Sequence, residues 1–246
     1  MNIFSALYTE ILYRPLFNAL VFFYTNLPWQ DLGIAIIVLT ICIRILLTPL
    51  LWKGQKAQKE LALIQPELKK IQEQFKDDRE KQGRAIMDLY AKRRVNPFSG
   101  CLIALVQLPV LIALFGVFRH VADPAQLAYL YSAVSNPGAL DPISFSLIDL
   151  SKGGIQGLGL GFVAAVSQYF QTKMTLPSLP TATGAKNDFS RMLQVQSTYV
   201  FPLIIFAWSY TLPAALALYW TILNILGILQ EIIMRRIKDH ESRITG

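Results

Sequence analysis

The stretch from Gly33 to Leu51, GIAIIVLTICIRILLTPLL, decides how this chain folds. Its nineteen residues are apolar enough to cross the ~30 Å hydrocarbon core of a bilayer as a helix, and Arg44 stands among them. A charge near the middle of such a helix costs about 2.5 to 3.5 kcal/mol on insertion scales, so it is usually retained for a function. The stretch therefore predicts a transmembrane helix with a functional arginine.

Two threonines extend this charge into a polar stripe. Thr40 and Thr48 lie four residues before and after Arg44, which places the three side chains on one face of a helix. Such a stripe should face a protein interior or a water-filled cavity, because facing lipid is costly. The alternative is that Arg44 snorkels toward the headgroups near Leu51, about 10 Å away at 1.5 Å per residue.

The whole chain has the composition of a polytopic membrane protein. Of its 246 residues, 53% are hydrophobic and 16% charged, and its mean hydropathy is +0.40. The net charge of +7 is confined to a few segments without groove-reading motifs, so we interpret it as a topology signal and expect no nucleic-acid partner. Cys42 and Cys101 lie in or beside apolar runs, and no disulfide framework is implied. No basic segment precedes Arg14, so we expect no cleaved signal peptide and treat Met1 as the mature start.

We expect an all-α protein with five transmembrane helices, an N-terminal interfacial amphipathic helix, and a cytoplasmic α-helical hairpin between the first two spans. The expected segments are an extracytoplasmic interfacial helix (1–27), the first span (28–52), the cytoplasmic hairpin (53–96), the second span (97–122), an extracytoplasmic loop (123–154), the third span (155–173), a cytoplasmic loop (174–195), the fourth span (196–211), the fifth span (212–234) and a cytoplasmic tail (235–246).

The hairpin prediction comes from apolar residues at helical spacing. The apolar positions of its first half are Leu61, Ile64, Leu68, Ile71 and Phe75. A regular apolar stripe needs a partner surface, which could be the membrane, the bundle or another protein. Pro66 should kink the first helix or mark a local restart. The alternative is a solvated linker whose charges only set orientation.

Lysine and arginine counts set the expected orientation. The segments 52–96, 173–199 and 235–246 carry twelve, three and four of them, whereas the opposite side has only Arg14, Arg119 and Lys152. Cytoplasmic segments of membrane proteins carry the excess of basic residues. We therefore expect the N-terminus outside and the C-terminus in the cytoplasm, which five crossings allow.

The polar residues of the spans gather toward the cytoplasmic side under this orientation, and the outer halves contain few hydrogen-bonding side chains. A conducting pore would need polar lining throughout its length. The pattern instead predicts a hydrophilic pocket that opens to the cytoplasm and to lipid and is closed outside. The alternative is that single amides join neighbouring helices. The candidate lining residues are Arg44, Thr40, Thr48, Gln107, Gln168, Gln171, Trp220 and Asn224.

Several linked motifs resemble a known family over nearly the whole chain. TICIRILLTPL of the first span is followed by NPFSGC and QLP in the second, QYFQTKM in the third and LYWTILN in the fifth. In this order and spacing they resemble the YidC/Oxa/Alb membrane protein insertases, specifically the short five-span bacterial type.

This resemblance implies an insertase that transfers short polar segments of nascent membrane proteins and releases their hydrophobic segments into lipid. Arg44 would be the groove charge, with Gln168 and Trp220 as groove-facing neighbours, and helices three and five would form an apolar slide. The hairpin would meet the nascent chain first. The expected partners are nascent membrane proteins and the lipid bilayer, with the ribosome and a Sec-type translocon as further partners to test. The expected location is the bacterial cytoplasmic membrane.

Other function classes fit the residues less well. An intramembrane protease would need catalytic or metal-binding groups within the spans, whereas His120 and His240 both lie outside them. No enzyme activity and no cofactor are therefore expected. A secondary transporter that binds an anionic solute at Arg44 remains the alternative, although such transporters usually contain internal repeats and five unequal spans show none.

Overall fold

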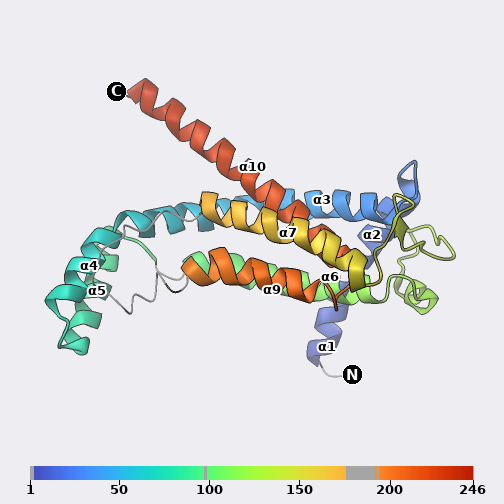
Figure 1. The fold of residues 1–246 in the computed structure, drawn as a ribbon, viewed down its shortest axis with the longest axis horizontal. Helices are drawn as coiled ribbons and strands as arrows, with labels where there is room; N and C mark the ends of the chain where they lie inside the picture. The colour runs from blue at the N-terminus through green and yellow to red at the C-terminus, as the bar shows by residue number, and fades with distance from the viewer. Residues whose placement is uncertain (1–2, 97–98, 176–191, 193, 246) are drawn as a thin grey trace.

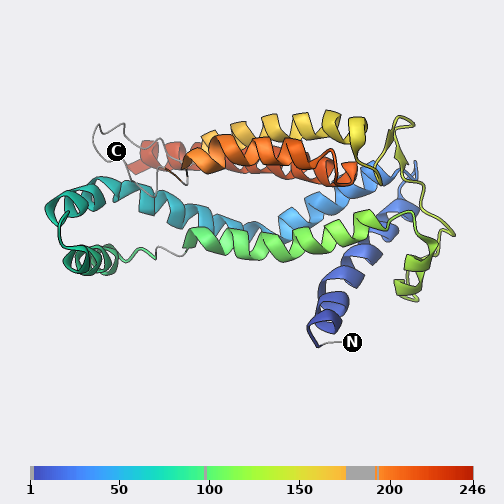
Figure 2. The ribbon, with the colours of Figure 1, turned by 60° about the horizontal axis from the view of Figure 1, so that its bottom comes forward.

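The computed structural model describes residues 3–96, 99–175, 192 and 194–245, and this part of the chain is almost entirely helical. Long helices lie side by side along the molecule, and the segment that contains a short antiparallel strand pair lies at one end (Figures 1 and 2). The elements are α1 (Ile3–Tyr8), the π-helical turn η1 (Thr9–Tyr13), α2 (Arg14–Asn26), α3 (Leu32–Leu63), α4 (Gln65–Gln74), α5 (Arg79–Arg93), α6 (Ser99–Arg119), the 3-10 helix η2 (Pro124–Tyr129), β1 (Ile143–Ser144), β2 (Ile148–Asp149), α7 (Gly154–Thr175), the π-helical turn η3 (Gln196–Val200), α9 (Phe201–Trp208) and α10 (Ala214–Thr245).

Two helices of the described chain are long and apolar enough to cross a membrane. They run over Leu32–Leu63 and Ala214–Ile237, and shorter apolar helices cover Val106–Arg119 and Gln196–Trp208. The predicted class, a helical membrane protein, agrees with these helices.

The start of α3 is fixed by one carboxylate. Asp31 is the N-cap, and its side chain accepts a hydrogen bond from the Ile34 amide at 3.0 Å. It also accepts hydrogen bonds from Ser144 Oγ and the Phe145 amide, both at 2.6 Å. Burial alone would raise the pKa of Asp31, but these hydrogen bonds outweigh it and hold the pKa below its ordinary value. Asp31 therefore joins α3 to the turn between β1 and β2.

Glycine allows this contact to be close. A Cβ at Gly33 would lie 2.2 Å from Ser144 Oγ, and the Gly33 amide donates to that oxygen at 3.1 Å. In the turn, Phe145 and Ser146 adopt positive φ angles of 52° and 55°. This conformation disfavours residues with a Cβ, so the bonds from Asp31 help to hold it.

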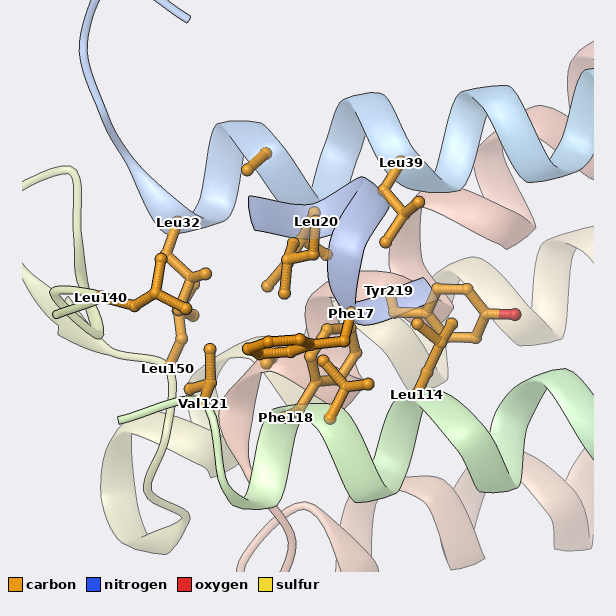
Figure 3. Close-up of a cluster of buried hydrophobic side chains, with 14 of the residues drawn as sticks. Phe17, Leu20, Leu32, Leu39, Leu114, Phe118, Val121, Leu140, Leu150 and Tyr219 are labelled. Carbon is orange, nitrogen blue, oxygen red and sulfur yellow. The ribbon is translucent and has the colours of Figure 1, made fainter. Parts of the chain in front are cut away.

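The main apolar cluster fills the space between α2, α3, α6 and α10 (Figure 3). Phe17 and Leu20 of α2 and Leu114 and Phe118 of α6 are completely buried in it. The N-terminal segment, expected as an interfacial helix, thus inserts α2 into the bundle. By contrast, Leu7 and Ile11, in the preceding turns, are exposed.

The helix α3 continues well beyond the apolar stretch. It runs without interruption to Leu63, with Pro49 inside it, so the expected boundary between first span and hairpin falls within one helix. Pro66 stands in the first turn of α4, which is the local restart that was one of the two expectations. Buried residues of this region pack on one another, so α4 and α5 supply much of each other's partner surface: Ile64, Leu68, Leu89 and Val95.

Small residues let α7 approach the connection between α9 and α10. A Cβ at Gly157 would lie 2.1 Å from the Ser209 carbonyl oxygen, and one at Gly161 would lie 1.9 Å from Ser209 Oγ. Glycine at these two positions therefore permits the close helix packing that the sequence indicates.

Candidate functional site

Tyr219 marks the boundary between the apolar cluster and a polar region. Its ring is completely buried among apolar side chains, and Figure 3 shows its hydroxyl directed away from that cluster. Gln107 Nε2 donates a hydrogen bond to this hydroxyl at 2.5 Å, and Arg44 interacts with it electrostatically. The polar groups of α3, α6 and α10 thus begin where the apolar cluster ends.

Arg44 lies between α3 and α10. Its Nη2 donates to Gln230 Oε1 at 2.9 Å, while its Nε is buried and has no hydrogen-bond partner. No ion pair found among the described residues includes Arg44. The guanidinium is therefore directed toward a neighbouring helix and retains donor capacity.

Gln230 of α10 lies between Arg44 and Gln55 and forms a hydrogen bond with each of them. Its Nε2 donates to Gln55 Oε1 at 3.0 Å, which leaves its own Oε1 to accept from Arg44. Gln171 of α7 reaches the same place, because both its Cγ and Arg44 Nη2 lie close to Gly227. We call the following residues the Arg44 cluster: Arg44, Gln55, Gln107, Gln171, Tyr219 and Gln230.

The two threonines of the stripe form hydrogen bonds within α3. Thr40 Oγ1 donates to the Ile36 carbonyl at 2.6 Å, and Thr48 Oγ1 donates to the Arg44 carbonyl at 2.7 Å. Both bonds follow the i to i−4 pattern of hydroxyls in apolar helices. The threonines lie on the face of Arg44 as expected, but their hydroxyl hydrogens are directed to the backbone.

The glutamines of α7 line one face of that helix. Gln168 Nε2 donates to Thr172 Oγ1 at 3.0 Å, and Gln171 Nε2 donates to Thr175 Oγ1 at 3.4 Å. Both glutamines are partly buried. Gln171 lies next to Arg44, and Gln168 precedes it by about one helical turn.

Two further candidates have different surroundings. Asn224 is buried, and its amide donates to the Ala164 carbonyl at 3.2 Å and to Ser167 Oγ at 3.0 Å. These bonds join α10 to α7, as in the alternative that an amide serves helix packing. Trp220 is partly buried and packs against apolar clusters.

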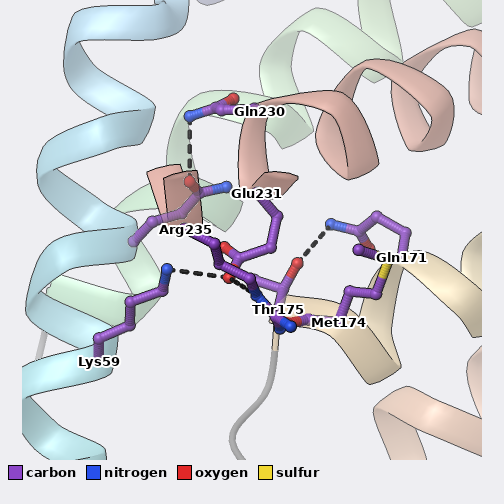
Figure 4. A network of polar contacts seen from close by, with 8 residues as sticks. Lys59, Gln171, Met174, Thr175, Gln230, Glu231 and Arg235 are labelled. Carbon is purple, nitrogen blue, oxygen red and sulfur yellow. Dashed lines mark hydrogen bonds and ion pairs between the residues drawn. The ribbon is translucent and has the colours of Figure 1, made fainter. Parts of the chain in front are cut away.

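A second set of polar residues lies beside the Arg44 cluster (Figure 4). Glu231 is 1% exposed, and its Oε1 accepts from Lys59 Nζ and from Arg235 Nε, both at 2.9 Å. Arg235 also donates to the Met174 carbonyl at 2.5 Å, and Glu231 Oε2 is buried without a partner. We call these four residues the Glu231 network; it ties α3, α7 and α10 together.

Sequence reasoning missed Gln55, Lys59, Gln230 and Glu231, although the sequence carries signals for three of them. Gln55 and Lys59 continue the stripe of Arg44 and Thr48 at helical spacing, past the last apolar residue considered. Glu231 is a charge within the apolar run ILGILQEIIM, which is the same signal that draws attention to Arg44.

Known proteins share sequence similarity with most of this chain. The family described as 60Kd inner membrane protein matches residues 22–241. The chain belongs to this family. The membrane protein insertase YidC of Fusobacterium nucleatum subsp. nucleatum is 33% identical over 201 residues, which are 82% of this chain and 84% of that protein.

Two other relatives show how far the similarity extends. YidC 2 of Bacillus anthracis, also named a membrane protein insertase, is 29% identical over 246 residues, covering 98% of this chain and 86% of the relative. The YidC of Geotalea daltonii is 31% identical over 218 residues, covering 89% of this chain but only 36% of that longer protein. The resemblance to the YidC/Oxa/Alb family is therefore confirmed.

Proposed function

We propose that this chain is a membrane protein insertase. It draws polar segments of nascent membrane proteins into a positively charged groove that opens to the cytoplasm, and it releases their hydrophobic segments into lipid. The observation that carries this mechanism is Arg44, a guanidinium within the bundle that has no carboxylate partner among the described residues and has an unpartnered Nε.

Electrostatics gives this guanidinium its role. In surroundings of low dielectric constant, an arginine attracts a carboxylate far more strongly than it does in water. A short acidic tail that enters partway from the cytoplasm gains this attraction before its hydrophobic segment moves into lipid, which lowers the remaining barrier. The groove then stabilises a polar segment without forming a covalent bond.

The groove is proposed to be lined by five of the candidates from the sequence. Arg44, Gln107, Gln168, Gln171 and Trp220 form its wall, with Thr40, Thr48 and Asn224 on the same helices. The dense apolar cluster around Phe17 and Phe118 supports closure at the opposite end of the groove. The part of α3 that packs in this cluster, residues 32–39, carries no polar side chains.

The proposed topology has five spans, formed by α3, α6, α7, α9 with η3, and α10. The pair α4 and α5 lies at the same end of the molecule as the C-terminal part of α10, whereas β1 and β2 lie at the other end (Figures 1 and 2). The basic residues are concentrated at the first end, which supports a cytoplasmic hairpin and C-terminus and an outer N-terminus. The hairpin is proposed as the first contact for the nascent chain in the bacterial cytoplasmic membrane.

Insertion by the purified full chain in proteoliposomes tests this function. The substrate is a single-span protein with a short N-terminal tail that contains one Asp, and a matched substrate has Asn instead. Arg44→Ala should lower insertion of the Asp substrate more than that of the Asn substrate, and Arg44→Lys should restore part of the difference. Arg119→Ala removes the same charge at the far end of α6 and serves as the control.

The outcomes separate the candidate functions. An unchanged Asp to Asn ratio in Arg44→Ala, with folded protein, would contradict the groove mechanism. Uptake of a labelled organic anion by the same vesicles, with no insertion of either substrate, would support the transporter instead.

A further inference from the structure

The structure assigns a specificity role to Gln230: its amide occupies Arg44 when the groove holds no substrate, and a substrate carboxylate displaces it. This inference rests on the proposed function and concerns the selectivity of the same groove. It makes Gln230 a positioning residue, because it acts on the substrate only through Arg44.

The hydrogen bonds fix which atom of Gln230 faces Arg44. Arg44 can only donate, so the Gln230 oxygen must face Arg44, and the Gln230 nitrogen is left to donate to Gln55 Oε1. The amide is therefore held on both sides. Its oxygen is a neutral acceptor that satisfies one guanidinium donor at 2.9 Å.

A substrate carboxylate makes the stronger bond to the same donor. Coulomb attraction between two full charges adds to the hydrogen bond, and a carboxylate can accept two parallel bonds from one guanidinium, whereas an amide oxygen offers only one atom. Arg44 Nε, which is buried and unpartnered, offers the second donor. A neutral amide at position 230 thus competes weakly with an acidic tail and comparably with a neutral polar tail.

The neighbouring acid explains why a neutral side chain at position 230 matters. Glu231 follows immediately, but its carboxylate accepts from Lys59 and Arg235. Successive residues of a helix point about 100° apart, so one turn of α10 offers an amide to Arg44 and a carboxylate to other cations. The helix thus carries an acid close to the groove without neutralising the groove charge.

The decisive variant is Gln230→Glu, which has nearly the same shape and provides a permanent internal carboxylate for Arg44. In the proteoliposome assay, it should lower insertion of the Asp-tail substrate by about tenfold relative to the Asn-tail substrate, because the internal acid competes with the substrate acid. Gln30→Glu, which makes the same charge change on an exposed side chain just before α3, far from the groove and the hairpin, should leave the ratio unchanged.

A second variant tests the same idea from the other side. Gln230→Leu removes the internal acceptor that competes with neutral tails, so it should raise insertion of the Asn-tail substrate and lower the Asp to Asn ratio below that of the parent protein. Thermal unfolding in detergent verifies that both variants fold. The ratio is informative because a purely structural defect lowers insertion of both substrates together.

The results distinguish this inference from the function on which it rests. If Arg44→Ala changes the Asp to Asn ratio and folded Gln230→Glu and Gln230→Leu do not, the role of Gln230 is overturned while the groove mechanism stands. If none of the three variants changes the ratio, the groove mechanism itself fails. A lower Asp to Asn ratio in both variants supports the assignment, provided that Gln230→Glu lowers insertion of the Asp substrate and Gln230→Leu raises insertion of the Asn substrate.

Discussion

Gly227 of α10 is the position at which Arg44 of α3 fits against its neighbour. A Cβ on Gly227 would lie 3.5 Å from Arg44 Nη2 and 3.1 Å from Gln171 Cγ. Three helices therefore meet at one residue without a side chain, and the guanidinium uses the space that a larger residue would fill.

Enlarging Gly227 should disturb the groove. Gly227→Leu should displace Arg44 or Gln171 and destabilise the protein by about 1 to 3 kcal/mol, as overpacking usually does. Insertion of an acidic-tail substrate should fall more than that of its neutral counterpart. Gly159→Leu on α7 is the matched control, because a Cβ there meets no neighbouring atom within 4 Å. Equal behaviour of the two variants would mean that Gly227 does not seat the guanidinium.

Glu231 should contribute strongly to stability. Glu231→Leu leaves Lys59 and Arg235 without their shared carboxylate and should destabilise by about 1 to 3 kcal/mol, which is below the range for fully buried pairs because both cations are partly exposed. Thermal unfolding in detergent measures the loss. Glu80→Leu breaks an exposed ion pair with Arg84 and should cost about 0 to 1 kcal/mol. Similar losses in both variants would argue against a structural role for the Glu231 network.

Asn224 should matter for packing more than for selectivity. Asn224→Ala removes two hydrogen bonds to α7 and should destabilise by about 1 kcal/mol, a typical value for polar contacts between transmembrane helices. The Asp to Asn insertion ratio should stay at the parent value. A shifted ratio without loss of stability would instead place this amide among the groove contacts.

Asp31 should make the stability depend on pH. Its folded-state pKa is lowered from 3.8, so its contribution is fully present above about pH 4 and is lost as the pH falls through the folded-state value. Asp31→Asn should lower the melting temperature at pH 7, through loss of a helix cap and of the bonds to the β1 and β2 turn. The difference from the parent should shrink in acid, and a constant difference from pH 7 to 3 would contradict this role.

Much of the fold could be predicted because hydrocarbon imposes simple constraints on sequence. The apolar run around Arg44 and the restart at Pro66 follow from span length and from the missing proline amide hydrogen. The continuity of α3 past Leu51 could not be predicted in the same way. A helix that leaves an apolar environment can continue or end, and its own residues permit both.

The site was only partly visible in the sequence, for reasons that differ by residue. Arg44 stood out because an isolated charge is rare in an apolar span. Tyr219 carries no such signal, since an aromatic residue in an apolar helix usually belongs to the core. For Asn224, pocket lining and helix packing require the same residue type, and only its contacts with Ala164 and Ser167 separate them.

The proline inside α3 gives that helix a mechanical property. Pro49 donates no amide hydrogen bond to the carbonyl four residues earlier, so α3 bends more easily there than elsewhere. Arg44 precedes Pro49 in α3, whereas Gln55, Lys59 and the pair α4 and α5 follow it. The bond from Gln230 to Gln55 crosses from α10 to the part of α3 beyond Pro49, so the position of the amide beside Arg44 depends on how far α3 bends at this proline.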